Sequence, residues 1–226
     1  METNTSMIVV DPAAAPTAAV IWLHGLGADG HDFAGIQQML GLPPDHGIRF
    51  IFPHAPLQPV TINGGYVMRA WYDIYDIGPD KPEDQSGLES SERILLEIVG
   101  QLGAEGIAPE RIVLAGFSQG GAVSLFTAMR SARVFAGVLA LSTYLPAAQL
   151  VNSTITASAR NIPVWMAHGT QDEVVPMYFG ELSRDRLLAL GVTVDWHSYD
   201  MAHSVVDPEI SDIGIWLTRI LAASNP

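Results

Sequence analysis

The sequence predicts an α/β fold, in which a mostly parallel sheet is covered by helices on both faces. Runs of apolar residues of strand length alternate with amphipathic segments of helix length along the whole chain. Some of these runs, such as Ala18–His24 and Phe135–Ser142, are almost entirely apolar, which is typical of strands buried on both faces. The chain has 226 residues, 48% of them hydrophobic, which suits one domain with a large core. We therefore expect a single domain over residues 1–226, without a large separate cap domain.

The strands are expected where apolar or alternating runs are bounded by glycine, proline or polar residues. In chain order these runs are Met7–Val10, Ala18–His24, Ile48–Phe52, a run from Arg111 that ends before Ser118, Phe135–Ser142, Ile162–His168 and Val192–Tyr199. The last of these alternates between apolar and polar residues, so we expect it nearer an edge of the sheet.

The helices are expected between these strands and carry recognisable end signals. Ser86–Glu89 has the pattern of a capping box, and Gly191 follows a helix that runs to about Leu190. Asp207 is the expected N-cap of the last helix, with Pro208 in its first turn. The remaining expected helices are Ala34–Leu40, the segment from the capping box to Gly103–Gly106, and the segment that follows Ser118.

Charge and composition exclude several classes of function. The net charge is −13, and Lys81 is the single lysine, so binding to nucleic acid or to an anionic membrane surface is disfavoured. The chain has no cysteine, which excludes disulfides, thiolate zinc sites and cysteine nucleophiles. Neither a signal peptide nor a run long enough to span a membrane is recognisable, and we expect a soluble, cytoplasmic protein. We expect no cofactor, and no spacing typical of a metal site is present.

The stretch from Arg111 to Phe126 contains the motif around which the chain is organised. Gly116-Phe-Ser-Gln-Gly fits G-x-S-x-G, the nucleophile elbow of α/β-hydrolases. A strand that turns at once into a helix holds its turn residue in a strained conformation and needs small neighbours. The pentapeptide alone is weak evidence, but a strand precedes it and a helical pattern follows. The sequence therefore predicts an α/β-hydrolase fold with Ser118 as the nucleophile.

An early glycine motif permits a second interpretation. Gly25, Gly27 and Gly30 satisfy G-x-G-x-x-G, the dinucleotide-binding pattern. That interpretation requires an acidic residue at the end of the next strand, where this chain has Pro53-His54. We instead expect this loop to direct the backbone N–H of Leu26 at the nucleophile, with His24 holding the loop by hydrogen bonds.

A serine nucleophile needs a base, and the base needs an acid, in the chain order serine, acid, histidine. His203 lies in a loop after a strand and is the predicted base, whereas His197 lies within a strand. His168 ends a strand and is expected to brace the acid loop. Asp172 follows that strand and is the predicted acid. Glu173 is its nearest rival. Asp185 is expected within a helix, Asp195 within a strand, and Asp200 is too close to His203 in sequence to be a separate orienting group.

The transition state of acyl transfer carries an oxyanion that needs hydrogen-bond donors. The N–H of Gln119 lies at a helix N-terminus, where the helix dipole also favours negative charge. The N–H of Leu26 is the predicted second donor.

Residues 55–86 show little helical periodicity, but they include four aromatic residues, Tyr66, Trp71, Tyr72 and Tyr75. Long irregular segments in compact domains are usually functional or disordered, and the aromatic density argues against disorder. We expect an ordered loop with short strands lying over the active site. The alternative is that the segment packs on the surface without contacting substrate.

Together, the motifs of this chain resemble those of the phospholipase/carboxylesterase family of α/β-hydrolases, which includes acyl-protein thioesterases and small bacterial carboxylesterases. The motifs are His24-Gly-Leu-Gly, Pro53-His-Ala-Pro, Trp71-Tyr-Asp, Gly116-Phe-Ser-Gln-Gly-Gly, His168-Gly-x-x-Asp and Met201-Ala-His, and they extend over nearly the whole chain. The sequence looks most similar to the bacterial carboxylesterases. By resemblance, Ser118, Asp172 and His203 match the family triad, and Leu26 and Gln119 match its oxyanion positions.

The resemblance also implies a substrate class. Members hydrolyse short- to medium-chain acyl esters through an acyl-enzyme, some act on lysophospholipids or acylated proteins, and homodimers are common among them. The implied acyl-binding residues are Trp71, Ile74, Ile77, Tyr144 and Leu145. Many members have proline where this chain has Arg69, which gives the channel mouth a freer backbone and a positive charge.

Three functions therefore remain to be compared. The leading hypothesis is a serine carboxylester hydrolase. An acyl-protein thioesterase or lysophospholipase would use the same triad. A non-catalytic binding protein of this fold usually lacks a triad member, and none is missing here.

Overall fold

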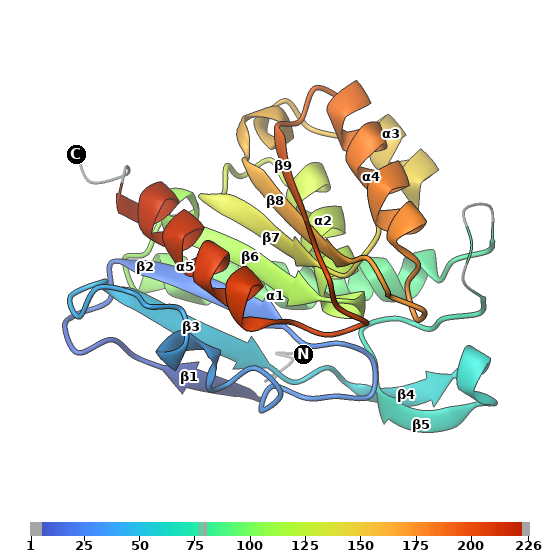
Figure 1. Cartoon of the computed structure of the whole chain (residues 1–226), viewed down its shortest axis with the longest axis horizontal. Coiled ribbons are helices and arrows are strands. Elements are labelled where there is room, and N and C mark those ends of the chain that lie inside the picture. The colour runs from blue at the N-terminus through green and yellow to red at the C-terminus, as the bar shows by residue number, and fades with distance from the viewer. Residues whose placement is uncertain (1–5, 77, 79–80, 223–226) are drawn as a thin grey trace.

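The computed structural model describes residues 6–76, 78 and 81–222. It contains a seven-stranded sheet with the strand order β1-β3-β2-β6-β7-β8-β9, drawn in Figure 1. Strand β1 pairs antiparallel with β3, and the other pairs in this sheet are parallel. The strands are β1 (Met7–Val10), β2 (Ala18–Leu23), β3 (Ile48–Pro53), β6 (Ile112–Phe117), β7 (Gly137–Leu141), β8 (Val164–Gly169) and β9 (Val194–Tyr199).

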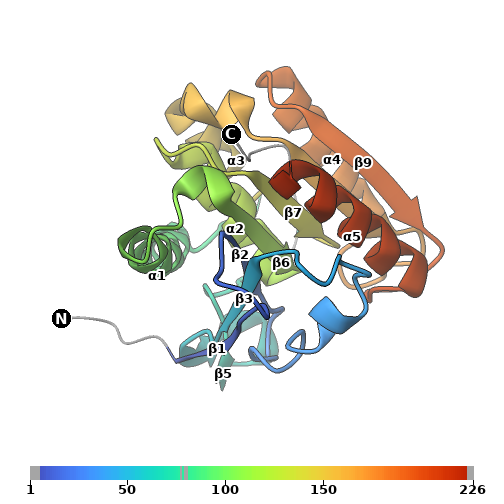
Figure 2. The same cartoon turned by 90° about the vertical axis from the view of Figure 1, so that its left-hand side faces the viewer.

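Helices cover both faces of this sheet, as Figure 2 shows. They are α1 (Gln85–Ala104), α2 (Gln119–Arg130), α3 (Ala148–Thr154), α4 (Met177–Ala189) and α5 (Asp207–Ala222). One core cluster contains buried residues of α1, α2, α3 and α4, and the other contains those of α5 and of the segment before β3. The α/β-hydrolase architecture predicted from the sequence is therefore confirmed.

Strand β2 shows why the central strands of this sheet have to be apolar on both sides. Its residues are all at most 1% exposed. Ile21 and Leu23 belong to the first core cluster, whereas Val20 and Trp22 belong to the second. Successive side chains of a strand point to opposite faces, so a sheet covered on both faces buries every one of them. Each large apolar side chain buried in this way contributes about 1.5–3 kcal/mol relative to its exposed state.

Two of the predicted helix signals are wrong in detail. The N-cap of α1 is Asp84, whose Oδ1 accepts the N–H of Gly87 at 2.9 Å, whereas Ser86 lies inside the helix and its hydroxyl also donates to Asp84. Aspartate caps helices as well as serine does, and the capping-box pattern did not discriminate between the two positions. Near the C-terminus, Asp207 is the first residue of α5, so it is not the N-cap that the sequence predicted.

The predicted helix over Ala34–Leu40 is also wrong. Only one 3₁₀ turn, Ile36–Gln38, forms there. Gly35 and Gly41 flank this turn, and Gly41 has a positive φ of 61°. Glycine lowers helix propensity, and a segment this short has too few hydrogen bonds to offset the nucleation of a helix.

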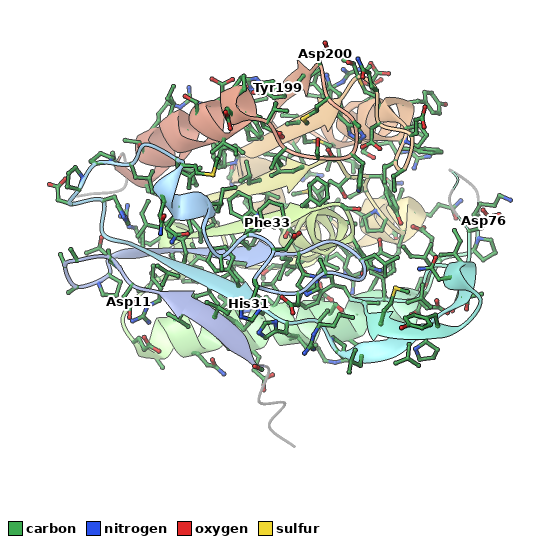
Figure 3. The ribbon with its side chains drawn as sticks, turned by 60° about the horizontal axis from the view of Figure 1, so that its bottom comes forward. Asp11, His31, Phe33, Asp76, Tyr199 and Asp200 are labelled. Atoms are coloured by element: carbon green, nitrogen blue, oxygen red, sulfur yellow. The ribbon has the colours of Figure 1, made fainter. Side chains whose placement is uncertain are left out.

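The irregular segment contains a β-hairpin of β4 (Leu57–Val60) and β5 (Tyr66–Arg69), so the expected short strands are present. Figure 1 shows this hairpin beyond the carboxyl ends of the parallel strands. Asp11 and Asp76, labelled in Figure 3, lie toward opposite ends of the sheet. In the part of the chain that is described, no helix is both long and apolar enough to cross a membrane.

Candidate active site

The turn between β6 and α2 has the strained geometry of a nucleophile elbow. Ser118 has φ 53° and ψ −120°, a combination that non-glycine residues rarely adopt. Its N–H donates to the carbonyl of Leu141 at 2.8 Å, and its carbonyl accepts the hydroxyl of Thr143 at 2.6 Å. These bonds from the end of β7 hold the turn in place, and the serine side chain is only partly buried.

The glycines around Ser118 are required by close backbone contacts. A Cβ on Gly116 would lie 2.2 Å from the carbonyl carbon of Gly120. A Cβ on Gly120 would lie 2.2 Å from the carbonyl oxygen of Leu23 in β2. Any side chain at either position would force the backbone of the elbow or of β2 to move. The motif is therefore a steric requirement of the turn in this chain.

Asp172 and His203 meet beside this turn, although they follow different strands. Asp172 follows β8, His203 follows β9, and Nδ1 of His203 lies 2.7 Å from Oδ2 of Asp172. The other carboxylate oxygen, Oδ1, accepts the N–H groups of Val174 and Val175 at 2.9 and 2.8 Å. The imidazole of His203 packs against the ring of Phe117, with the centroids 4.7 Å apart. Because Nδ1 donates to Asp172, the Nε2 atom of His203 is left as a proton acceptor.

The rival acids have other partners or positions. Asp195 pairs with His197, Asp185 pairs with Arg184, and Asp200 accepts a hydrogen bond from Gln171. Glu173 is exposed. The structure therefore brings Asp172, and none of these four residues, into hydrogen-bond contact with His203.

His168 is buried behind the acid. Its Nε2 atom lies 2.7 Å from the carbonyl of Val175, in the same loop as Asp172. Burial lowers the pKa of this imidazole, so the ring is neutral and donates from Nε2. This is the bracing contact predicted from the sequence.

The loop after β2 lies directly against the elbow. A Cβ on Gly25 would lie 3.5 Å from Cβ of Ser118, so the residue before Leu26 lies directly against the elbow. His24 holds the loop: its Nδ1 contacts the carbonyl of Gly25 at 2.7 Å, and its Nε2 accepts the N–H of Ala55 at 3.0 Å. Burial lowers the pKa of His24 and keeps the ring neutral. Gln119 is the first residue of α2, so its N–H has no acceptor within the helix.

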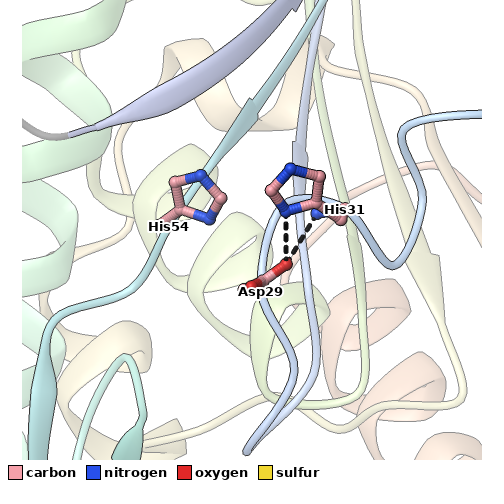
Figure 4. Close-up of side chains that lie close together, drawn as sticks. All are labelled: Asp29, His31 and His54. Carbon is pink, nitrogen blue, oxygen red and sulfur yellow. Dashed lines mark hydrogen bonds and ion pairs between the residues drawn. The ribbon is translucent and has the colours of Figure 1, made fainter.

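Asp29, His31 and His54 form the only cluster of potential metal ligands among the described residues, and Figure 4 shows them side by side. His54 accepts the N–H of Gly30 at its Nδ1, at 3.0 Å, so a neutral ring carries its proton on Nε2 and has no free lone pair. Both contacts of His31 with Asp29, through the backbone N–H and Nδ1, close a local turn. This arrangement therefore offers fewer than three free ligand atoms.

At the end of β3 the residues are Pro53 and His54, without the acid that a dinucleotide site would need.

The structure places only some of the predicted substrate-binding residues in a cavity. Tyr144 and Leu145 line a cavity of about 580 Å³, whose walls also include Glu83, Phe179 and Arg186. None of Ser118, Asp172, His203, Trp71 and Ile74 is among its lining residues. Trp71 is 1% exposed, and Ile74 is partly buried against the core. Ile77 lies outside the described residues.

Two side chains near the site have roles that sequence patterns did not indicate. Arg69 donates from Nη1 to the carbonyl of Ala55 at 2.7 Å, and its own carbonyl accepts the N–H of Gly27 at 2.9 Å. It thus joins the hairpin to the loop that contains Leu26. The side chain of Gln119 bonds both Trp71 and Tyr72. No local sequence pattern predicts these hydrogen bonds of Arg69 and Gln119, because each bond joins residues that are far apart in the chain.

Comparisons with known proteins agree with this arrangement. The profile of the family described as Phospholipase/Carboxylesterase matches residues 4–220. Acyl-protein thioesterase 1 of Gibberella zeae is 37% identical over 227 residues, covering 96% of this chain and 97% of that protein. The crystal structure of Zea mays acyl-protein thioesterase 2 has a TM-score of 0.87 at 30% identity, covering 96% of this chain and 99% of that one. Arabidopsis thaliana SOBER1 has a TM-score of 0.86 at 31% identity, covering 90% and 99%. This chain belongs to the phospholipase/carboxylesterase family of α/β-hydrolases.

Proposed function

We propose that this protein is a serine carboxylester hydrolase that works through an acyl-enzyme on Ser118. The observation that carries the proposal is the 2.7 Å contact of His203 with Asp172, made beside a strained serine turn. His168 and His24 contact backbone groups, and His31 and His197 pair with the exposed carboxylates of Asp29 and Asp195. His203 instead pairs its Nδ1 with a buried carboxylate, the arrangement that a general base requires.

In the proposed reaction, Nε2 of His203 removes the proton of the Ser118 hydroxyl as the oxygen attacks the ester carbonyl. The backbone N–H groups of Leu26 and Gln119 stabilise the resulting oxyanion. The C–O bond to the alcohol then breaks, and His203 returns the proton to the leaving oxygen. Water attacks the acyl-enzyme by the same route and releases the carboxylic acid. Asp172 keeps the imidazole in the required tautomer and stabilises its protonated form.

The acyl chain is proposed to extend past Tyr144 and Leu145 into the cavity beside them. Glu83 and Arg186 contribute ionisable side chains to the wall of that cavity. Burial raises the pKa of Glu83. Short to medium acyl chains are the proposed substrates, and the homodimer implied by the resemblance stays a prediction.

A fluorophosphonate tests the nucleophile. We expect covalent labelling of the wild-type protein and none of Ser118→Ala, with Ser124→Ala, a buried serine of α2, labelled like wild type. Equal labelling of wild type and Ser118→Ala would contradict the assignment.

A second candidate is an acyl-protein thioesterase, favoured by the two fungal relatives of that name that are 37% and 36% identical over nearly their whole length. The same triad can cleave a thioester, so the two candidates differ only in leaving group and acyl length. The test compares kcat/KM for p-nitrophenyl esters of two to sixteen carbons with kcat/KM for S-acylated cysteine peptides of matched chain length. A preference of more than about tenfold for the S-acyl peptides would favour the thioesterase.

A further inference from the structure

The amide side chain of Gln119 connects the elbow to the segment that follows the hairpin. Its Oε1 accepts the N–H of Trp71 at 2.8 Å, and its Nε2 donates to the carbonyl of Tyr72 at 2.7 Å. Gln119 is 2% exposed, so water cannot replace either bond without entering the core. A side chain that accepts and donates at once is needed here, and the amide provides both at every pH.

Trp71 is also held from two other directions. Its indole Nε1 donates to the carbonyl of His24 at 2.9 Å, in the loop that precedes Leu26. Its carbonyl accepts the hydroxyl of Ser91 from α1. The residue therefore joins the oxyanion loop, the elbow and α1 at a single buried point.

The next residue carries this connection to the cavity. The hydroxyls of Tyr72 and Tyr144 lie 2.9 Å apart, and Tyr144 is one of the cavity-lining residues. Burial raises the pKa of Tyr144 to about 12 and that of Tyr72 well above its ordinary value. Both phenols are therefore neutral at neutral pH, and one hydroxyl can donate to the other. A continuous set of contacts thus runs from Gln119 through Tyr72 to the wall at Tyr144.

We propose that the side chain of Gln119 is a positioning residue for acyl-chain selectivity: by clamping Trp71–Tyr72, it fixes the Tyr144 wall of the cavity relative to Ser118. This rests on the proposed function, since it assumes that the acyl chain uses that cavity. The backbone N–H of Gln119 serves the oxyanion, whereas its side chain acts only through Trp71 and Tyr72. One residue thereby ties the position of the reacting carbonyl to the position of the chain attached to it.

The test compares wild type with Gln119→Glu, Gln119→Met and Ser91→Ala on p-nitrophenyl acetate, butyrate and octanoate. Ionised glutamate keeps an acceptor for Trp71 but places an oxygen against the carbonyl of Tyr72, whereas protonated glutamate keeps both bonds; methionine keeps neither. We expect the ratio of kcat/KM for octanoate to that for acetate to fall about tenfold or more in Gln119→Met, chiefly through a higher KM for octanoate. In Gln119→Glu the ratio should fall only as the pH rises through the range in which its carboxyl ionises. Ser91→Ala, which loosens Trp71 from the side of α1, should lower the ratio in the same direction by about threefold. Gln101→Glu, an exposed change on α1, is the control and should keep the wild-type ratio.

Thermal melts identify any variant that does not fold, and Ser91→Ala then carries the test because it leaves the elbow intact. Equal losses of kcat/KM for all three esters, or an unchanged ratio, would overturn the positioning role. A wild type that neither hydrolyses the esters nor is labelled at Ser118 would overturn the proposed function and this proposal with it. An active wild type whose ratio is the same in every variant would overturn only the role of Gln119.

Discussion

His203 is held by one oxygen of Asp172, while the other oxygen of that carboxylate accepts two backbone N–H groups. Oδ2 lies 2.7 Å from Nδ1 of His203, and Oδ1 lies 2.9 and 2.8 Å from the N–H groups of Val174 and Val175. The loop that contains Asp172 therefore orients its carboxylate independently of the contact with His203. Because the two oxygens have different partners, the orientation of an asparagine side chain at this position can be predicted.

Asp172→Asn should lower kcat by roughly 10³–10⁴-fold without unfolding the protein. The two N–H groups require an acceptor at Oδ1, so the new NH₂ group must face His203. The imidazole then has to accept at Nδ1 and carry its proton on Nε2, which is the wrong tautomer for a base. Ester hydrolysis by purified variants measures the effect, with Asp200→Asn in the neighbouring loop as a control expected within about twofold of wild type. Activity of Asp172→Asn close to that of the control would remove Asp172 from the mechanism.

His203→Ala should lose nearly as much activity as Ser118→Ala, and the double variant should lose little more than either. Nucleophile and base act as one unit, so removing either leaves mainly the contribution of the oxyanion donors and of binding. Single-turnover hydrolysis of p-nitrophenyl butyrate measures the three variants, with His197→Ala, on β9, as the matched histidine control. Strictly additive losses in the double variant would show that the two residues act independently.

Gly120→Ala and Gly100→Ala should change stability in opposite directions. A Cβ on Gly120 would lie 2.2 Å from the carbonyl oxygen of Leu23, so we expect a loss of more than about 2 kcal/mol. Gly100 is exposed in the interior of α1, and nothing lies within 4 Å of a Cβ placed there. Alanine at position 100 should therefore stabilise the helix by about 0.5–1 kcal/mol. Urea unfolding of both variants measures the difference, and a Gly120→Ala protein as stable as wild type would argue against the close contact.

Glu209→Gln should remove a pH dependence of stability. Glu209 is fully buried in α5, and neither carboxylate oxygen has a hydrogen-bond partner of good geometry within the described chain. Burial raises its pKa from 4.5 to about 8, and the nearby N–H of Val206 offsets only part of that rise. Between these two values the folded protein holds a proton that the unfolded chain has lost. The free energy of unfolding therefore falls as the pH rises through this window, by at most about 1.4 kcal/mol per pH unit.

The measurement for Glu209 is urea unfolding at pH 5, 6.5 and 8. The advantage of Glu209→Gln over wild type should grow with pH across this range. Glu110→Gln, at an exposed glutamate, should keep the pH dependence of wild type. Parallel pH profiles for wild type and Glu209→Gln would show that Glu209 is ionised in the folded protein.

Much of the fold was predictable because its signals are local. Buried strands such as β2 and β7 are continuous apolar runs, and the elbow needs small residues within five positions of the chain. The error at the start of α1 occurred where two local signals compete at close range. Asp84 and Ser86 are both good caps, and it is Asp84 that accepts the N–H of Gly87 with one oxygen and the N–H of Asp73 with the other.

The sequence by itself determined the sharp strand-to-helix turn at Ser118, the positions of Asp172 and His203 in loops that follow strands, and the loop-holding contacts of His24. These conclusions follow from backbone sterics and from the ends of strands, which a linear pattern records. Only the tertiary structure decided that Asp172 alone among the nearby acids contacts His203, that Trp71 is buried, and that Gln119 clamps it across 48 positions of sequence. Such contacts depend on how separate elements pack against one another, and hydrogen bonds between distant residues leave no periodicity or spacing in the chain.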